Sequence, residues 1–154
     1  MSVATLDFPV LRTREEWETG PAPAAICRCQ GDVRWAEHLV IIFPLWLGGL
    51  PALLRAFFEQ LFRPGFAFAG NLAKGGTKLL QGRSARVVVT MGMPAPVYRW
   101  FFRAHSLKSL ERNVLKFCGI SPVKDTIVGM VESGGAERHG RWLVTMRALG
   151  RRGC

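Results

Sequence analysis

The sequence predicts an α/β domain built around a parallel β-sheet. Two segments, Leu39–Phe43 and Ala85–Thr90, are continuously apolar and rich in branched residues, a pattern typical of strands covered on both faces. A helical pattern follows each of them, so strands and helices alternate along the chain. Such alternation indicates right-handed crossovers, with helices on both faces of the sheet.

The chain before the first strand is expected to be less regular. Ser2–Leu6 is predicted to be a short strand or the tail of one. Asp7–Pro23 is polar and rich in turn-forming residues, which indicates a surface connection. A helix is expected over Ala24–Ala36, and it would carry Trp35 toward the core.

A helix and a long loop are predicted between the two clear strands. Pro51 suits the first turn of a helix, because the N–H that proline lacks would be unpaired there anyway. The expected helix, Pro51–Phe62, carries one apolar stripe, and Arg55 and Glu59 form an i,i+4 pair elsewhere on its surface. Gly65–Gly82 is predicted to be a loop that leads to the second strand.

The second half of the chain repeats the alternation. Helical character is expected over Trp100–Phe117, with a break near Ser106 and a C-cap at Gly119. Asp125–Val131 is predicted to be a third strand, and Ala136–Leu149 a closing helix. The whole chain, 1–154, is therefore expected to form a single domain.

Composition limits the class of protein. Apolar residues make up 49% of the chain, too many for a disordered protein. The four cysteines lack the spacing of a metal site, so we expect reduced thiols and a cytoplasmic location, with Cys118 a buried thiol. No signal peptide is visible. The apolar run Leu39–Leu54 falls short of the ~20 residues that span a membrane, so no membrane span is expected.

The chain is basic, with a formal net charge of +10. A basic excess can indicate nucleic acid, an anionic membrane surface or a phosphate-bearing ligand. The positive charges are scattered and no recognition motif accompanies them, so a solvated basic face is favoured over a nucleic-acid site. The densest set is Arg99, Arg103, Lys108, Arg112 and Lys116.

The candidate ligand-binding residues follow the first two strands, because open parallel sheets bind ligands beyond the carboxyl ends of their strands. The first loop offers an apolar wall, an indole N–H and glycines for close backbone approach, which suits a flat heteroaromatic ring. A tight turn whose Trp packs on a helix explains this loop about equally well. The second loop offers a hydroxyl and a glycine. The two loops are Pro44-Leu45-Trp46-Leu47-Gly48-Gly49 and Thr90-Met91-Gly92-Met93.

Two further side chains are candidates for chemistry. Tyr98, the only tyrosine, could donate its hydroxyl to an anionic ring oxygen, and His105 could stabilise charge that develops during reduction. A surface or helix-capping histidine is the simpler interpretation of His105. No Gly-x-Ser-x-Gly or His-Glu-x-x-His motif occurs, and the three histidines lack metal-ligand spacing, so no metal is expected.

The sequence resembles the flavodoxin-like NAD(P)H:quinone oxidoreductases of the DT-diaphorase type. The segment His38–Leu54 carries this resemblance, together with Arg63-Pro64-Gly65-Phe66-Ala67-Phe68. Segments similar to the bacterial branch, which includes ancillary subunits of potassium efflux systems, are Thr90–Pro94, Tyr98–Trp100 and Leu110–Gly119. The similarity runs from about Leu6 to Val131.

The resemblance implies a three-layer flavodoxin-like fold and a flavoprotein oxidoreductase that works as a homodimer. FAD is the implied cofactor, with FMN the alternative. By a ping-pong scheme, NAD(P)H would reduce the flavin, which would then pass two electrons to a quinone or related acceptor. The family's flavin loops correspond to Pro44–Gly48 and Thr90–Met93, its active-site Tyr and His to Tyr98 and His105, and its aromatic groups from the partner subunit to Phe66 and Phe68.

The chain departs from the family at its N-terminus. Relatives begin with a strand, a phosphate-binding loop and a helix, whereas this chain starts near the tail of the second strand. We therefore expect either an N-terminally truncated sheet, in which one side of Leu39–Phe43 lacks its neighbour, or a shift of Ser2–Leu6 that covers this side. The alternative function is a non-catalytic flavodoxin-like fragment or interaction subunit that binds flavin weakly or not at all.

Overall fold

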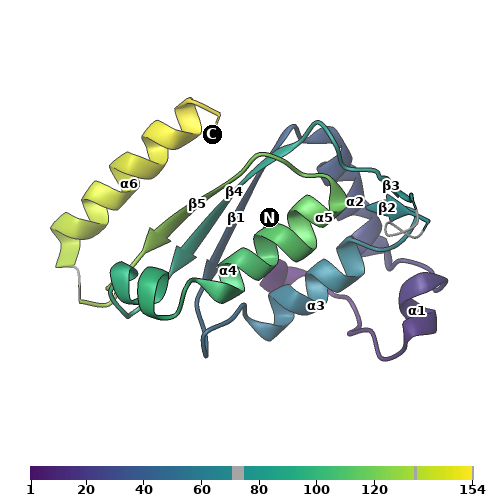
Figure 1. Cartoon of the computed structure of the whole chain (residues 1–154), viewed down its shortest axis with the longest axis horizontal. Coiled ribbons are helices and arrows are strands. Elements are labelled where there is room, and N and C mark those ends of the chain that lie inside the picture. Colours follow the sequence, from purple (N-terminus) through teal and green to yellow (C-terminus); the bar gives the residue numbers. More distant parts are fainter. Residues whose placement is uncertain (71–74, 134, 154) are drawn as a thin grey trace.

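The computed structural model describes residues 1–70, 75–133 and 135–153. Its central element is a parallel sheet with the strand order β1-β4-β5 (Figure 1). The strands are β1 (His38–Pro44), β4 (Ser84–Thr90) and β5 (Val123–Val128). The first two confirm the predicted strands, whereas the third begins and ends earlier than the predicted Asp125–Val131. The last residue of each strand pairs with the last residue of its neighbour, so all three carboxyl ends meet at one edge.

Most of the core lies on one face of the sheet. Phe43, Val87 and Val89 point to this face and are almost completely buried. Helix α2 (Ala24–Trp35), helix α3 (Ala52–Leu61) and a second long helical segment pack there. That segment consists of α4 (His105–Ser109), the π-helical stretch η4 (Leu110–Leu115) and α5 (Lys116–Cys118).

The opposite face of the sheet is incompletely covered. The expectation that both faces of β1 are buried is wrong, because Val40 and Ile42 are 58% and 65% exposed. Helix α6 (Gly135–Arg151) lies on this side of the sheet, beside β5, and none of its residues is buried (Figure 1). The apolar run in β1 therefore predicts the strand correctly. Its prediction of burial is correct for one face of the strand and wrong for the other.

The N-terminal elements differ from the prediction. Val3–Thr5 forms a 3₁₀ turn (η1) instead of a strand. The predicted surface connection contains the short helix α1 (Arg14–Glu18). Thr13 caps this helix, since its hydroxyl accepts a hydrogen bond from the backbone N–H of Glu16 at 3.1 Å. The Thr-x-x-Glu spacing is a capping signature and could have predicted the helix.

The predicted helices α2 and α3 are confirmed, with one correction in α2. Arg55 and Glu59 form the expected ion pair at 3.1 Å. Trp35 is 87% exposed instead of pointing to the core. The buried stripe of α2 passes through Val33, and a residue two positions further on lies on the opposite side of a helix.

Two regions that were predicted as one element are divided in the structure. The Gly65–Gly82 loop contains a small hairpin of β2 (Phe68–Ala69) and β3 (Thr77–Lys78), and its residues 71–74 lie outside the described residues. The predicted helical break falls at Phe102–Ala104, after a π-helical turn (η3, Val97–Phe101), rather than near Ser106.

Candidate functional site

The two predicted loops are direct neighbours at the carboxyl edge of the sheet. Pro44 and Thr90 are paired in register as the last residues of β1 and β4. The backbone N–H of Leu45 then donates a 2.8 Å hydrogen bond to the carbonyl of Thr90. The structure therefore brings together the two loops that the sequence identified separately.

The first loop is a tight turn that holds its apolar side chains outward. Trp46 and Gly49 exchange two backbone hydrogen bonds of 2.8 and 3.1 Å. Leu47 and Gly48 between them have φ of 47° and 76°, as a two-residue hairpin turn requires. Trp46 is 62% exposed and Leu47 fully exposed. Most of the Trp46 side chain is therefore in solvent, and the turn holds an apolar surface outward.

The second loop is held against the chain that follows β5. The carbonyls of Met91 and Met93 accept hydrogen bonds of 3.1 Å from the backbone N–H groups of Val131 and Met130. Gly129 sits so close that a Cβ there would lie 2.5 Å from the backbone nitrogen of Ala95. This close packing fixes the backbone of the loop at the sheet edge.

Four backbone N–H groups in these loops are free to bind a ligand. Within the described part of the chain, no protein acceptor takes a hydrogen bond from the N–H groups of Leu47, Gly48, Gly92 and Met93. Unpaired N–H donors beside an apolar wall suit a flat ring with a polar edge.

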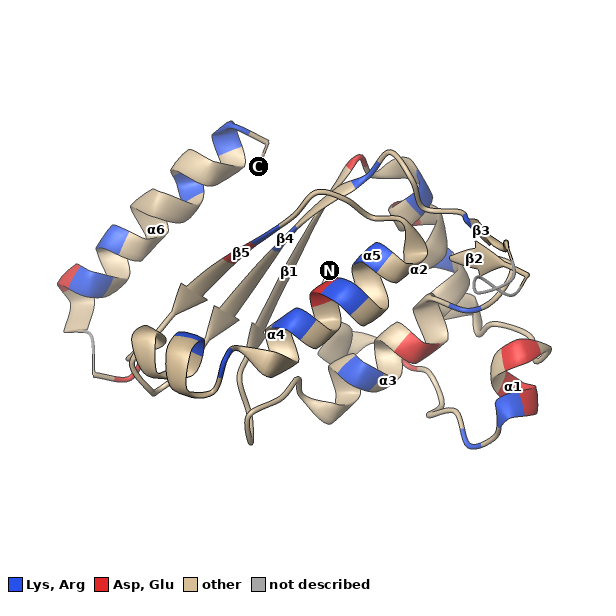
Figure 2. Ribbon diagram, in the orientation of Figure 1, with Lys and Arg blue, Asp and Glu red and all other residues tan. Residues whose placement is uncertain are grey.

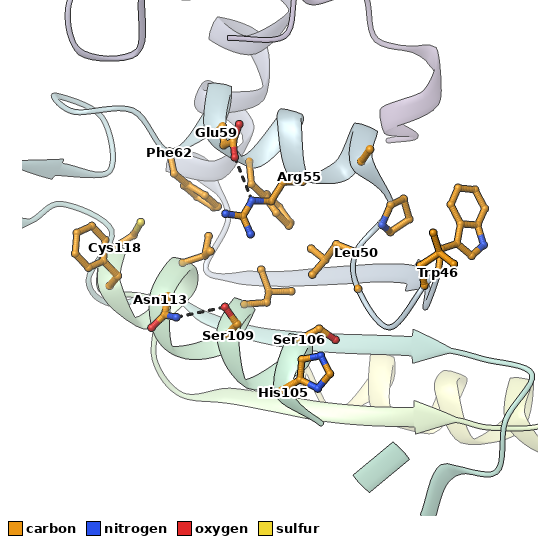
Figure 3. A pocket seen from close by; sticks show the side chains of 18 of the residues that line it. Trp46, Leu50, Arg55, Glu59, Phe62, His105, Ser106, Ser109, Asn113 and Cys118 are labelled. Carbon is orange, nitrogen blue, oxygen red and sulfur yellow. Dashed lines mark hydrogen bonds and ion pairs between the residues drawn. The ribbon is translucent and has the colours of Figure 1, made fainter. Parts of the chain in front are cut away.

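His105 lies in the same hollow as the first loop. A groove with a cavity volume of about 900 Å³ runs between α3 and the α4–α5 segment, and its lining includes Trp46, Leu47 and His105. Figure 3 shows Trp46 and His105 away from the end that holds Cys118. The imidazole Nδ1 lies 3.0 Å from the carbonyl oxygen of Phe102. Because a carbonyl only accepts, Nδ1 carries the proton there and Nε2 is available to a ligand.

Tyr98 was predicted to contact the ligand, but its side chain does not line the hollow. The side chain is 1% exposed. Its hydroxyl lies 2.6 Å from Oγ of Ser106 and accepts a 3.3 Å hydrogen bond from the backbone N–H of Leu107. The hydroxyl is therefore used within the chain, where it joins the η3 turn to the start of α4.

The two predicted aromatic residues lie in different environments. Phe66 is buried, with the Arg34 guanidinium 5.1 Å from its ring centre. Phe68 lines the groove and packs edge-on against Phe117 at 5.2 Å between ring centres. Trp17 of α1, which the sequence analysis did not identify, also lines the groove, 5.9 Å from Phe68.

The charged, amide and thiol groups of the groove are either paired or buried. Arg55 and Glu59 form their ion pair on its α3 wall, and the Asn113 amide donates to Ser109 at 3.3 Å on the opposite wall (Figure 3). Burial raises the pKa of the Cys118 thiol to about 12, so this thiol is protonated at neutral pH. The described residues contain no group of three His, Cys, Asp or Glu side chains that could hold a metal ion.

Comparison with known proteins identifies the family. Residues 2–142 match the model of the flavodoxin-like fold family, described as "Flavodoxin-like fold", so the chain belongs to that family. The fold predicted from the sequence is thereby confirmed. None of the described helices has the length and apolar character needed to cross a membrane.

Several curated proteins are similar to this chain. An "Uncharacterized NAD(P)H oxidoreductase" of Haemophilus influenzae is 24% identical, over 80% of this chain and 63% of the relative. An "FMN-dependent NADH:quinone oxidoreductase" of Nitratidesulfovibrio vulgaris is 29% identical, over 74% of this chain and 54% of the relative. The human "Ribosyldihydronicotinamide dehydrogenase [quinone]" is 31% identical, over 71% and 48%. The chain thus spans about half to two thirds of the length of these relatives.

Solved structures are similar over most of this chain. Smu.1420 from Streptococcus mutans UA159 aligns with a TM-score of 0.76 at 30% identity, over 96% of this chain and 76% of that one. An FMN-dependent NADH-azoreductase from Bacillus anthracis str. Ames Ancestor, in complex with FMN, aligns with a TM-score of 0.71 at 17% identity, over 100% and 80%. At the latter identity the likeness concerns the fold alone.

Proposed function

We propose that this chain is a flavin-dependent oxidoreductase that transfers electrons from NAD(P)H to a quinone or related acceptor. The observation that carries the proposal is the pairing of the two strand-end loops, joined by the bond between Leu45 and Thr90. They combine an apolar turn with free N–H donors, which is the chemistry that an isoalloxazine ring requires. Relatives named NADH:quinone oxidoreductases support the choice of electron donor and acceptor.

FMN is the cofactor that we propose. The family resemblance implied FAD as the cofactor, whereas a relative and a similar solved structure are named for FMN. A flavin ring fits both loops: Leu47 and Trp46 offer apolar surface, and the N–H groups of Gly48, Gly92 and Met93 offer donors. A flavin held by these loops would supply hydride-transfer chemistry between NAD(P)H and the acceptor.

His105 is the side chain that we assign to the chemistry. Its Nδ1 is held by the carbonyl of Phe102, which fixes the ring and leaves Nε2 available at the groove. Because Nδ1 already donates to that carbonyl, Nε2 would donate only in the doubly protonated ring, and an imidazolium there would stabilise negative charge that develops on a ring oxygen during reduction. Tyr98 acts through position in our proposal, because its hydroxyl holds Ser106, the residue after His105.

We further propose that the protein works as a homodimer in the cytoplasm. The groove between α3 and α5 is lined mainly by apolar side chains, including Trp17, Phe68 and Phe117. An apolar surface of this kind suits a second subunit, whose side chains would complete the acceptor pocket. Phe68 lies in the groove, where a second subunit would meet it. Phe66 is buried beside Arg34 and does not reach that surface. Light scattering at several protein concentrations would measure the oligomeric state.

The proposal is tested by titrating the protein with FMN and with FAD while following flavin fluorescence. We expect FMN to be quenched at lower protein concentration than FAD, and the loaded protein to oxidise NADH or NADPH only when a quinone is supplied. Quenching by neither flavin at micromolar protein would exclude flavin chemistry for this chain.

The second candidate is a non-catalytic flavodoxin-like module. The exposed Val40 and Ile42 on the sheet favour it, because a sheet face left apolar is suited to another polypeptide segment rather than to catalysis. This module would dimerise or dock on a partner protein and would bind flavin weakly. Tight FMN binding with NAD(P)H-dependent quinone reduction would eliminate it.

A further inference from the structure

Three consecutive aromatic side chains project from the carboxyl edge of the sheet. Trp100, Phe101 and Phe102 are 75%, 79% and 42% exposed, and we call them the aromatic knob. The rings of Phe101 and Phe102 lie 5.0 Å apart, edge to face, so part of their contact is with each other. Clustered exposed aromatics are uncommon on soluble proteins and mark surfaces that bind something.

The backbone holds the knob in its exposed position. On its N-terminal side, Tyr98 is anchored in the core through Ser106. On its C-terminal side, Arg103 and Ala104 have φ of 54° and 46°, a left-handed conformation that costs about 1 kcal/mol or more at each non-glycine residue. The fold thus maintains two strained residues between η3 and α4. A continuous helix through these residues would give the three rings different directions.

The knob is linked to the hollow of the first loop through His105. Trp46 and Leu47 share a hollow with His105, and the His105 ring is bonded to the carbonyl of Phe102. The first loop extends beyond the carboxyl end of β1, and η3, which leads into the knob, extends beyond that of β4 (Figure 1). Five exposed apolar side chains therefore belong to the two segments that follow the carboxyl ends of β1 and β4.

The part of the chain that carries the knob is basic along its whole length, from η3 to the end of α6. Residues 97–154 contain eleven Lys and Arg but only four Asp and Glu. Two of these acids are neutralised, Asp125 by Arg99 and Glu111 by Lys116, both at 2.6 Å. The remaining acids are Glu132 and Glu137. Figure 2 shows basic positions on the loop around the knob, on α4 and along α6.

We propose that this edge docks on an anionic lipid bilayer. Trp and Phe side chains partition into the headgroup boundary of a membrane, and Arg and Lys beside them contact anionic headgroups. The knob protrudes, as insertion requires, whereas a nucleic-acid strand needs a basic groove along which bases stack. Arg103 adjoins the knob and Lys108 lies in the helix that follows it. Arg138 and Arg141 lie in α6, which begins a few residues after the carboxyl end of β5.

Docking in this orientation would open the candidate site toward the lipid. The hollow that contains Leu47 and His105 lies at the same edge as the knob. The acceptor would then be a quinone dissolved in the bilayer. This choice of acceptor rests on the proposed function, whereas the docking does not. Docking itself requires no flavin, so the two proposals fail separately.

The experiment is co-sedimentation of the whole chain with vesicles, measured without flavin. We expect binding to vesicles of mixed phosphatidylcholine and phosphatidylglycerol and much weaker binding to pure phosphatidylcholine. The double variant Trp100→Ala, Phe101→Ala should bind the mixed vesicles at least about tenfold more weakly, because two inserted rings are lost. The matched control is Trp35→Ala, since Trp35 is also exposed but ends α2, next to the amino end of β1.

Three outcomes would overturn the proposal. The first is equal binding of the double variant and the unaltered chain to the mixed vesicles, with circular dichroism showing both folded. The second is binding to heparin that exceeds vesicle binding and is unaffected by the double variant, which would assign the charge to a soluble polyanion. The third is loss of self-association in the double variant without loss of vesicle binding, which would assign the knob to a second copy of the chain.

Discussion

The hydrogen bond from the backbone N–H of Leu45 to the carbonyl of Thr90 joins the two loops of the candidate site. At 2.8 Å it continues the parallel ladder one residue beyond the end of β1. The position of each loop is therefore fixed by the sheet rather than by side-chain contacts. A change that moves one loop should alter ligand binding without requiring any change in residues that contact the ligand.

Gly129→Ala should weaken flavin binding from a distance. The new Cβ would meet the backbone nitrogen of Ala95 at 2.5 Å and the carbonyl oxygen of Met93 at 2.8 Å, so the second loop must shift. We expect the dissociation constant for FMN to rise about tenfold and the free energy of unfolding to fall by ~1–3 kcal/mol. Fluorescence titration and urea denaturation measure the two quantities.

The matched control for this change is Gly140→Ala in α6. A Cβ at Gly140 would meet nothing within 4 Å, and alanine favours a helix interior by up to ~1 kcal/mol. FMN affinity should be unchanged there. An unaltered FMN affinity in Gly129→Ala would show that the second loop does not contribute to the site.

Leu47→Asn should separate stability from binding. Leu47 is fully exposed and has φ of 47°, a conformation that asparagine adopts more readily than leucine. We expect the free energy of unfolding to rise by ~0.5–1 kcal/mol, while FMN binds several-fold more weakly because an apolar contact is lost. Leu143→Asn, at an exposed position of α6, is the control for polarity and should leave FMN binding unchanged. Stronger FMN binding by Leu47→Asn would contradict the apolar wall.

The sequence predicted the three sheet strands because each begins or contains a run of branched apolar residues whose pattern is local. It predicted the two loops for the same reason, since they directly follow β1 and β4. The direction of the Tyr98 hydroxyl depends on Ser106, eight residues away, and no pattern encodes that contact. Likewise, the run in β1 is apolar on both faces, and only the three-dimensional arrangement shows that Val40 and Ile42 are uncovered.

Tyr98→Phe distinguishes a structural from a chemical role for this hydroxyl. Its removal deletes the contact with Ser106 and leaves the N–H of Leu107 unpaired, so we expect a loss of ~1–2 kcal/mol in the free energy of unfolding. Ser106→Ala removes the same side-chain contact from the other partner. If the role is structural, the two variants should lower quinone reduction similarly. A turnover number that falls much further in Tyr98→Phe would assign the hydroxyl to the chemistry.

Arg86→Met should stabilise the chain. Arg86 is 8% exposed on the incompletely covered face of the sheet, and its Nε has no partner in the described residues. Its Nη1 donates to Thr126 at 2.8 Å, while its neighbour in register on β5 is another cation, Lys124. Because a buried charge without a carboxylate is costly, we expect the free energy of unfolding to rise by ~1–2 kcal/mol.

The exposed Lys124 provides the control for Arg86. Lys124→Met removes a charge from the same row of the sheet but relieves no burial, so a change within ~0.5 kcal/mol is expected. A destabilised Arg86→Met variant in urea denaturation would mean that the guanidinium packs favourably where it lies. The absence of a carboxylate partner would then not make the burial of Arg86 costly.

Cys118 should make the stability of the chain depend on alkaline pH. Burial raises the pKa of its thiol from 9.0 to about 12, so the unfolded chain releases this proton at lower pH than the folded chain. The stabilisation that results is complete below pH 9 and is lost as the pH rises toward 12, by at most about 1.4 kcal/mol per pH unit. Cys118→Ala should therefore flatten the fall of the urea midpoint above pH 9, whereas Cys27→Ala, at an exposed position, should not. If the slopes of the unaltered chain and Cys118→Ala coincide, the pKa of this thiol is not raised in the folded state, and burial does not protect it from ionisation above pH 9.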